Sequence, residues 1–264
     1  MKPSYDVYKN ENENAEWMIL IHGFCGNRKM WKRQMVFLKK QYHVLNFDLP
    51  GHGESQGIVL DKNNIILSTI DAFFEIMQEQ GIKSAHFMGV SLGTVFALLM
   101  AVMHKESVID MILCGGVIGI NGMGKFLLYA GYTFKGVVPY IWLYGLIAFM
   151  LLPHDKSSLS RRLFISNAKK LGRKQFNFWL SVIISAEKSF KLSPELIINT
   201  PKLCIMGEQD NVFLKMLIKE GCEENGFKLK TIPDCGHLCN IEKANEFNEI
   251  ALSFLQSTQN SIYA

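Results

Sequence analysis

The stretch GVSLG at residues 89–93 decides the fold of this chain of 264 residues. It stands between an apolar run at 85–88, typical of a β-strand, and an apolar run at 94–103, typical of an α-helix. Gly-x-Ser-x-Gly between a strand and a helix is typical of a nucleophile elbow, a turn so tight that the serine hydroxyl is exposed at a sheet edge. A side chain at either glycine would collide with the neighbouring strand or helix. We therefore predict that Ser91 is a nucleophile held at the edge of a sheet.

On both sides of this stretch, short apolar runs alternate with amphipathic ones. We expect strands at 17–21, 43–47, 85–88, 108–114, 202–206 and 227–232, and helices at 30–40, 65–80, 94–103, 211–225 and 241–256. The expected strands are apolar almost throughout, which is typical of strands covered on both faces. Their alternation with helices predicts an α/β fold with a mostly parallel sheet flanked by helices.

The alternation is interrupted between residues 116 and 194, where glycine clusters and a long aromatic run are followed by basic residues at helical spacing. We predict a core at 1–115 and 195–264, with a helical cap inserted at 116–194. The apolar run at 137–152 is shorter than the roughly 20 residues that span a bilayer. We interpret it as buried or lid-forming, with contact with a membrane surface as the alternative.

Composition excludes several classes of function. The formal net charge is only +4, and no basic block is interleaved with aromatic residues, so we expect no nucleic-acid partner. Cys235 and Cys239 flank His237, but Cys-x-His-x-Cys has no standard zinc spacing, so we expect no metal site and no cofactor. The first 16 residues are polar and acid-rich, without an apolar signal core, which favours a cytoplasmic location with reduced thiols.

Five motifs resemble those of the α/β-hydrolase fold family, specifically its cap-bearing, esterase-like branch. They are His22-Gly23, DLPGHGES at 48–55, the elbow at Ser91, GEQD at 207–210 and CGH at 235–237. They stand in the family's order at the ends of the expected strands, so the resemblance covers the chain outside the insert. It implies the α/β-hydrolase fold and a serine-dependent hydrolytic mechanism.

A serine hydroxyl is a weak nucleophile until a neighbouring base takes its proton. The resemblance places this base at His237, which follows the last expected strand in a loop that contains a glycine. Asp210, just beyond the strand at 202–206, is our candidate for the acid that orients the imidazole, in the chain order serine, acid, histidine. Glu208 and Asp234 remain alternative acids, although Asp234 is so close to His237 in sequence that it reaches the far ring nitrogen with difficulty.

An oxyanion hole requires two backbone N–H groups. We expect one from Leu92, at the N-terminal end of its helix, and the resemblance points to Phe24 for the other, whose ring would also wall the pocket. His22 and His52 are interpreted as braces of the neighbouring loops, as in the family. Asp48 is interpreted as a structural acceptor that holds the following turn.

The insert is the region where we expect substrate choice to be determined. Its aromatic and large aliphatic side chains are candidates for an apolar pocket, although most are expected to pack the insert's own helices: Phe126, Leu127, Tyr129, Tyr132, Phe134, Trp142, Tyr144 and Phe149. The basic segment 161–174 is interpreted as solvated helix surface, with an anionic-substrate site as the alternative.

Together these features predict a serine esterase that cleaves a small, hydrophobic carboxylic ester through an acyl-enzyme, as a monomer or homodimer without membrane contact. The same scaffold carries many reactions. One alternative is therefore a C–C bond hydrolase, an acyltransferase or another small-metabolite enzyme that uses the same triad. The other alternative is a ligand-binding signalling protein of the same fold.

Overall fold

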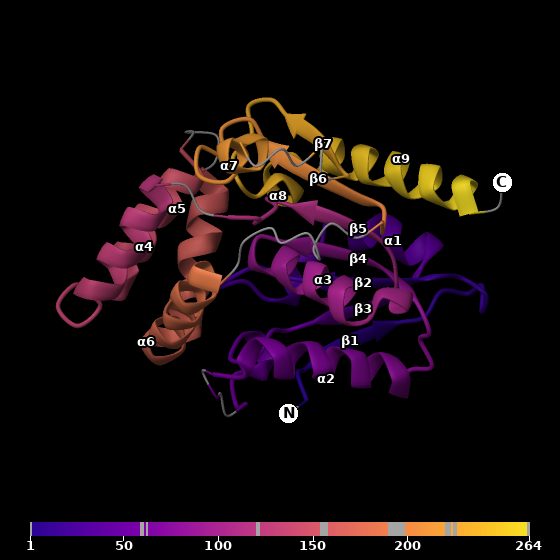
Figure 1. Cartoon of the computed structure of the whole chain (residues 1–264), viewed down its shortest axis with the longest axis horizontal. Helices are drawn as coiled ribbons and strands as arrows, with labels where there is room; N and C mark the ends of the chain where they lie inside the picture. The colour runs from indigo at the N-terminus through magenta and orange to yellow at the C-terminus, as the bar shows by residue number, and fades with distance from the viewer. Residues whose placement is uncertain are drawn as a thin grey trace.

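The computed structural model describes residues 2–58, 61, 63–119, 122–153, 158–189, 199–219, 223 and 226–262. In this part of the chain a seven-stranded sheet has the order β1-β3-β2-β4-β5-β6-β7 (Figure 1). The strands are β1 (Tyr5–Tyr8), β2 (Trp17–Ile21), β3 (His43–Phe47), β4 (Ala85–Val90), β5 (Val108–Cys114), β6 (Lys202–Gly207) and β7 (Phe227–Ile232). β1 is antiparallel to β3 and every other neighbouring pair is parallel, which confirms the predicted α/β fold.

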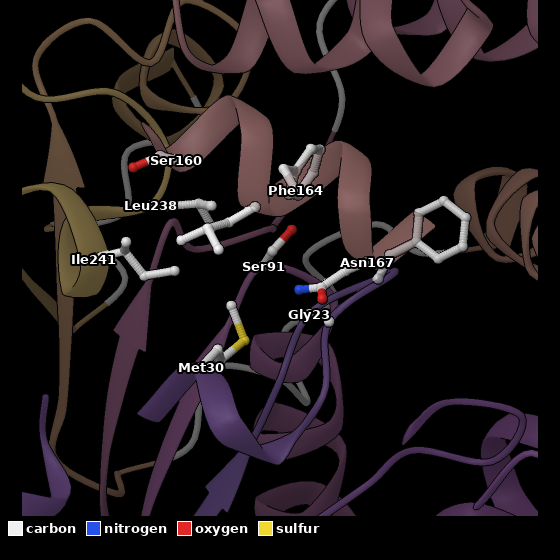
Figure 2. Close-up of a pocket in the computed structure, with 11 residues that line it drawn as sticks. Gly23, Met30, Ser91, Ser160, Phe164, Asn167, Leu238 and Ile241 are labelled. Atoms are coloured by element: carbon white, nitrogen blue, oxygen red, sulfur yellow. The ribbon is translucent and has the colours of Figure 1, made fainter. Parts of the chain in front are cut away.

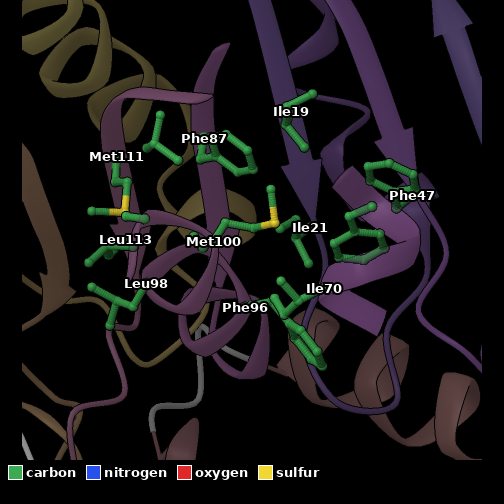
Figure 3. Packing of buried hydrophobic residues seen from close by; sticks show 14 of the residues in the cluster. Ile19, Ile21, Phe47, Ile70, Phe87, Phe96, Leu98, Met100, Met111 and Leu113 are labelled. Atoms are coloured by element: carbon green, nitrogen blue, oxygen red, sulfur yellow. The ribbon is translucent and has the colours of Figure 1, made fainter. Parts of the chain in front are cut away.

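Helices cover both faces of the sheet. Those of the core are α1 (Met35–Gln41), α2 (Ile65–Glu79), α3 (Leu92–Met103), α7 (Leu214–Lys219), α8 (Cys239–Glu242) and α9 (Ala244–Ile262). Short 3-10 helices lie at Arg28–Trp31, Gly53–Ser55 and Lys105–Ser107. Along β2, Ile19 and Ile21 pack with α2 and α3 (Figure 3), whereas Met18 and Leu20 pack with α1 and α9. Burial on both faces explains why the strands are apolar throughout.

Several elements differ from the expectation, and the helix expected at 241–256 is divided into α8 and α9. The helix expected at 30–40 is a 3-10 turn followed by α1, because the Asn27 side chain accepts from the Lys29 N–H and starts a tighter turn. The helix expected at 211–225 begins only at Leu214, because the Asp210 carboxylate accepts the N–H groups of Val212 and Phe213. The edge strand β1 was not predicted, since its four half-buried residues gain strand structure only by pairing with β3.

Three helices lie between β5 and β6 and form the insert: α4 (Gly122–Phe134), α5 (Tyr140–Leu151) and α6 (Ser158–Ser189). α6 is interrupted at Gly172, whose φ of 80° and ψ of 158° suit only glycine. The three helices stand together at the left of Figure 1, at one end of the sheet. The predicted end of the insert near residue 194 lies outside the described residues.

Aromatic contacts fasten α6 to the loops that follow β2 and β3. The Phe24 and Phe176 rings are 5.4 Å apart, and Trp179 Nε1 donates to the Pro50 carbonyl oxygen at 3.0 Å. Because both loops leave the carboxyl ends of parallel strands, the insert covers the sheet edge at which α/β proteins bind ligands.

The apolar run at 137–152, which we interpreted as buried or lid-forming, is buried on one face and exposed on the other. In α5, Tyr144 and Ala148 are buried, but Trp142 is 73% exposed and Phe149 is 58% exposed. Among the described residues, no helix is both long enough and apolar enough to cross a membrane.

Candidate active site

Ser91 occupies the strained turn that its sequence motif predicts. Its φ is 52° and its ψ is −118°, between the end of β4 and the start of α3. A Cβ atom on Gly89 would lie 2.5 Å from the Gly93 carbonyl oxygen, and one on Gly93 would overlap the Ile21 carbonyl oxygen. The Ser91 N–H donates to the Cys114 carbonyl oxygen at 2.9 Å. Both glycines are therefore required, and the elbow is tied to β5.

Asp210 and His237 are brought together from the loops after β6 and β7. His237 Nδ1 and Asp210 Oδ2 are 2.7 Å apart, and both side chains are buried. Asp210 Oδ1 accepts the N–H groups of Val212 at 3.1 Å and Phe213 at 2.9 Å. The Phe213 ring also lies 4.9 Å from the His237 ring, at an interplanar angle of 30°. The carboxylate and the imidazole are thus held in one orientation.

The two alternative acids occupy different surroundings. Glu208 is exposed and accepts a hydrogen bond from the Thr231 hydroxyl at 3.4 Å. Asp234 is also exposed, in a turn where its φ is 50°. Of the three candidate acids, Asp210 is the one that contacts His237 in the described part of the chain.

The other ring nitrogen of His237, Nε2, is buried and has no hydrogen-bond partner among the described residues. The ring lies over Gly115, where a Cβ atom would be 2.7 Å from His237 Cε1. The hydrogen bond between Ser91 and His237 that the triad calls for is not formed in this structure. Nδ1 is occupied by Asp210, so Nε2 is the nitrogen that is free to accept a proton.

The two candidate oxyanion donors belong to segments that adjoin Ser91. Leu92 is the first residue of α3, so its N–H has no acceptor within the helix. Phe24 follows Gly23, where a Cβ atom would be only 3.1 Å from Ser91 Cβ. The loop after β2 therefore passes directly beside the serine side chain.

Two buried histidines brace that loop. His22 Nδ1 donates to the Gly23 carbonyl oxygen at 2.7 Å, and its Nε2 accepts the Leu49 N–H at 2.9 Å. His52 Nε2 accepts the Cys25 N–H at 3.2 Å. Burial lowers the pKa of His22 to about 4. Burial and the neighbouring His22 ring lower the pKa of His52 to about 3. Both rings are therefore neutral near pH 7 and can accept from backbone N–H groups.

Asp48 organises the second loop as an acceptor. Its Oδ1 accepts the Arg28 N–H at 2.8 Å and its Oδ2 accepts the Glu54 N–H at 2.9 Å. Gly53 has a φ of 49° and lies so close that a Cβ atom would overlap the carboxylate. Asp48 thus fixes the conformation of the turn after β3.

A narrow cavity lies between Ser91 and α6 (Figure 2). Its lining residues are Gly23, Phe24, Gly26, Met30, Ser91, Ser160, Leu163, Phe164, Asn167, Leu238 and Ile241. The volume of about 20 Å³ is enough for one water molecule. In Figure 2 the Ser91 hydroxyl points towards α6. As expected from its position, Phe24 is part of the wall.

The aromatic residues proposed from sequence do not line this cavity. Phe126, Trp142 and Phe149 are exposed, whereas Tyr144 is buried and stacks on Phe164 with ring centroids 4.5 Å apart. The side chain of Leu127 lies outside the described residues. Sequence reasoning overlooked the α6 residues because they stand in a segment dominated by basic side chains.

Among the described residues, no group of three or more His, Cys, Asp and Glu side chains is arranged to hold a metal ion. Cys235 and Cys239 are buried free thiols on either side of the His237 loop. Hydrogen bonds with the thiols of Cys114 and Cys235, together with burial, raise the pKa of Cys239 well above its usual value. The Cys239 thiol is therefore protonated near neutral pH.

Comparison with known proteins shows which fold the chain shares with them. Residues 16–137, from β2 to beyond α4, match the family model of the alpha/beta hydrolase fold. The chain has the α/β-hydrolase fold. The enol-lactonase from Burkholderia xenovorans LB400 superposes on it with a TM-score of 0.80 at 20% identity, over 96% of each chain. At this identity, the structural similarity shows the shared fold.

Two sequence relatives align with almost the whole length of this chain. It is 25% identical to 2-hydroxy-6-oxo-6-phenylhexa-2,4-dienoate hydrolase of Comamonas testosteroni, over 95% of this chain and 91% of that protein. It is 24% identical to 3-oxoadipate enol-lactonase 1 of Acinetobacter baylyi, over 96% of this chain and 93% of that protein. Both alignments extend across the insert as well as the core.

Proposed function

We propose that this protein is a serine hydrolase that cleaves the carboxylic ester of a small, hydrophobic substrate. Ser91 is the nucleophile, His237 the base and Asp210 the acid. The observation that carries the proposal is the 2.7 Å contact between His237 Nδ1 and Asp210 Oδ2, which leaves Nε2 buried and without a partner. An imidazole held in this way has one nitrogen ready to take the serine proton.

The reaction proceeds in two halves. Ser91 Oγ attacks the ester carbonyl carbon while His237 Nε2 takes the hydroxyl proton, and the carbonyl electron pair moves to the oxygen. The N–H groups of Leu92 and Phe24 stabilise this oxyanion. The alcohol then leaves with the proton from His237, and water, deprotonated by the same nitrogen, releases the acid and restores Ser91.

The walls of the cavity favour an apolar group. Met30, Phe164, Leu238 and Ile241 surround the space over Ser91, with Asn167 as a polar group of α6. Because that space holds about one water molecule, we expect α6 to move away from the elbow when an ester binds. The insert therefore acts as a cap over the site.

A C–C bond hydrolase is the second candidate. The observation that favours it is the similarity, over 95% of this chain, to a protein named 2-hydroxy-6-oxo-6-phenylhexa-2,4-dienoate hydrolase. The similarity to an enol-lactonase favours the ester alternative, because a lactone is a cyclic ester. The triad geometry serves both reactions.

The deciding experiment measures hydrolysis of p-nitrophenyl esters from acetate to laurate, beside a 2-hydroxy-6-oxo-dienoate. We expect sustained ester turnover that is lost in Ser91→Ala and retained in Ser160→Ala, a matched serine in the wall of the same cavity. Turnover of the dienoate alone would assign the C–C reaction instead. Equal ester turnover by Ser91→Ala would eliminate the serine mechanism.

A further inference from the structure

The outward face of α5 is the part of the surface that neither the fold nor the proposed catalysis explains. Trp142, Leu146 and Phe149 recur at i, i+4 and i+7 and are 73%, 51% and 58% exposed. The turn before the helix adds Val137, which is 85% exposed. A helix face in contact with water normally carries polar side chains. α5 has no charged residue in its whole length.

The charge of the insert is the second, independent observation. Residues 122–189 contain ten lysines and arginines but only two acidic residues. The whole chain has 28 basic and 24 acidic residues, so 18 basic and 22 acidic residues remain outside this region. The insert is therefore strongly basic, while the remainder is slightly acidic.

Basic side chains lie at both ends of the apolar α5 face. At its C-terminal end, the Arg161 guanidinium lies over the Phe149 ring, 5.5 Å from the centroid. At its N-terminal end, Arg173 donates to the carbonyl oxygens of Lys135 and Gly136, directly before Val137. Aromatic side chains bordered by guanidinium groups match a surface that has an apolar interior and an anionic rim.

We propose that the insert binds the surface of an anionic lipid bilayer through the α5 face, defined here as Val137, Trp142, Leu146 and Phe149. The apolar side chains enter the boundary between headgroups and acyl chains, and the basic residues of the insert meet the lipid phosphates. Charge complementarity supports this choice, because in a symmetric contact between two copies of the chain each basic insert would face the other basic insert.

The length of α5 limits the mode of contact. Its 12 residues extend about 18 Å, which is well below the roughly 30 Å hydrocarbon thickness of a bilayer. The helix therefore lies in the membrane surface and does not cross it. This inference is independent of the proposed hydrolase activity, because binding is measured without turnover.

The test is co-flotation of the purified full-length protein with phosphatidylcholine vesicles, with and without an equal amount of phosphatidylserine. We expect flotation with the anionic vesicles and little with the neutral ones. Trp142 provides a second signal, because Trp31 and Trp179 are fully buried and Trp17 is half-buried in β2. Its fluorescence should shift to shorter wavelength on binding, and Trp142→Phe should float normally but lose most of the shift.

The double variant Trp142→Gln/Phe149→Gln should bind anionic vesicles at least roughly tenfold more weakly, because two large apolar side chains are removed. The matched control is Val36→Gln/Ile218→Gln. It replaces two apolar side chains outside the insert, in α1 and α7, that are 68% and 61% exposed. This control should float like the wild type. Circular dichroism confirms that both variants are folded.

Three results would overturn the proposal. The wild type would remain unbound to anionic vesicles, or would bind neutral and anionic vesicles equally. Alternatively, light scattering would show a wild-type dimer that Trp142→Gln/Phe149→Gln converts to a monomer, while vesicles bind neither protein. That last result would assign the α5 face to self-association.

Discussion

The backbone N–H of His237 donates a hydrogen bond to the carbonyl oxygen of Leu151, 3.0 Å away. Leu151 is the last residue of α5, so the insert directly supports the loop that carries the candidate base. In the same loop, a Cβ atom on Gly236 would lie 2.9 Å from the Leu151 carbonyl oxygen. Any displacement of α5 is therefore transmitted to the position of the imidazole.

Gly236→Ala tests this connection. The added methyl group should push the His237 loop away from Leu151, and we expect kcat/KM to fall about tenfold or more, because misplacement of a catalytic group by about 1 Å is costly. Gly145→Ala is the matched control, since no atom lies within 4 Å of its added Cβ atom. Equal activity of the two variants would show that the Leu151 contact does not position His237.

Asp210→Asn tests the assignment of the acid. The amide keeps the shape of the carboxylate but neither holds the required tautomer nor stabilises the charged imidazole. In serine proteases, the corresponding change lowers kcat by about 10⁴-fold. We expect a loss on the order of 10³- to 10⁴-fold in ester hydrolysis. Glu208→Gln and Asp234→Asn are the controls, and a comparable loss in either would transfer the role of the acid to that residue.

Gly93→Ala tests the packing of the elbow. Its Cβ atom would overlap the Ile21 carbonyl oxygen, so either β2 or α3 must shift. We expect the free energy of unfolding in urea to fall by about 3 kcal/mol, as for overpacked cores. Gly136→Ala has open space around its Cβ atom and should unfold like the wild type. An unchanged urea midpoint in Gly93→Ala would contradict this description of the turn.

A buried charge network predicts loss of stability at alkaline pH. His86 Nδ1 is 2.8 Å from Asp110 Oδ1, and Nε2 is 3.1 Å from Glu16 Oε2. Burial opposes the charged ring, but these hydrogen bonds outweigh it and raise the pKa of His86 from 6.5 to about 9. The resulting stabilisation is complete below pH 6.5 and is lost as the pH rises through 9. The shift corresponds to about 3 kcal/mol.

The measurement is the free energy of unfolding in urea from about pH 6 to about pH 10. The wild type should lose about 3 kcal/mol more over this range than His86→Gln. Since that variant leaves Asp110 buried without its charged partner, His86→Gln/Asp110→Asn serves as a second reference. Identical pH profiles for wild type and both variants would show that His86 is not charged in the fold.

Patterns within short segments made much of the fold predictable. The apolar strands, the elbow at Ser91 and the motifs at the strand ends depend on spacing along the chain, so the parallel sheet could be inferred without a structure. The residues that form the candidate site could be predicted, because the carboxyl ends of parallel strands meet at one edge of the sheet. Asp210 was preferred from its place after β6, but only the fold buries it and exposes Glu208 and Asp234.

Other features depend on contacts between distant segments. The start of α7 is set by Asp210, whose carboxylate takes two N–H groups that the sequence pattern assigned to a helix. The cavity over Ser91 is lined from α6, since Phe164 and Asn167 face the elbow only after the insert has folded onto the core. Periodicity shows which residues of a helix are apolar, but not what covers them. In α5 every face is apolar, so the exposure of Trp142 could be determined only by the tertiary structure.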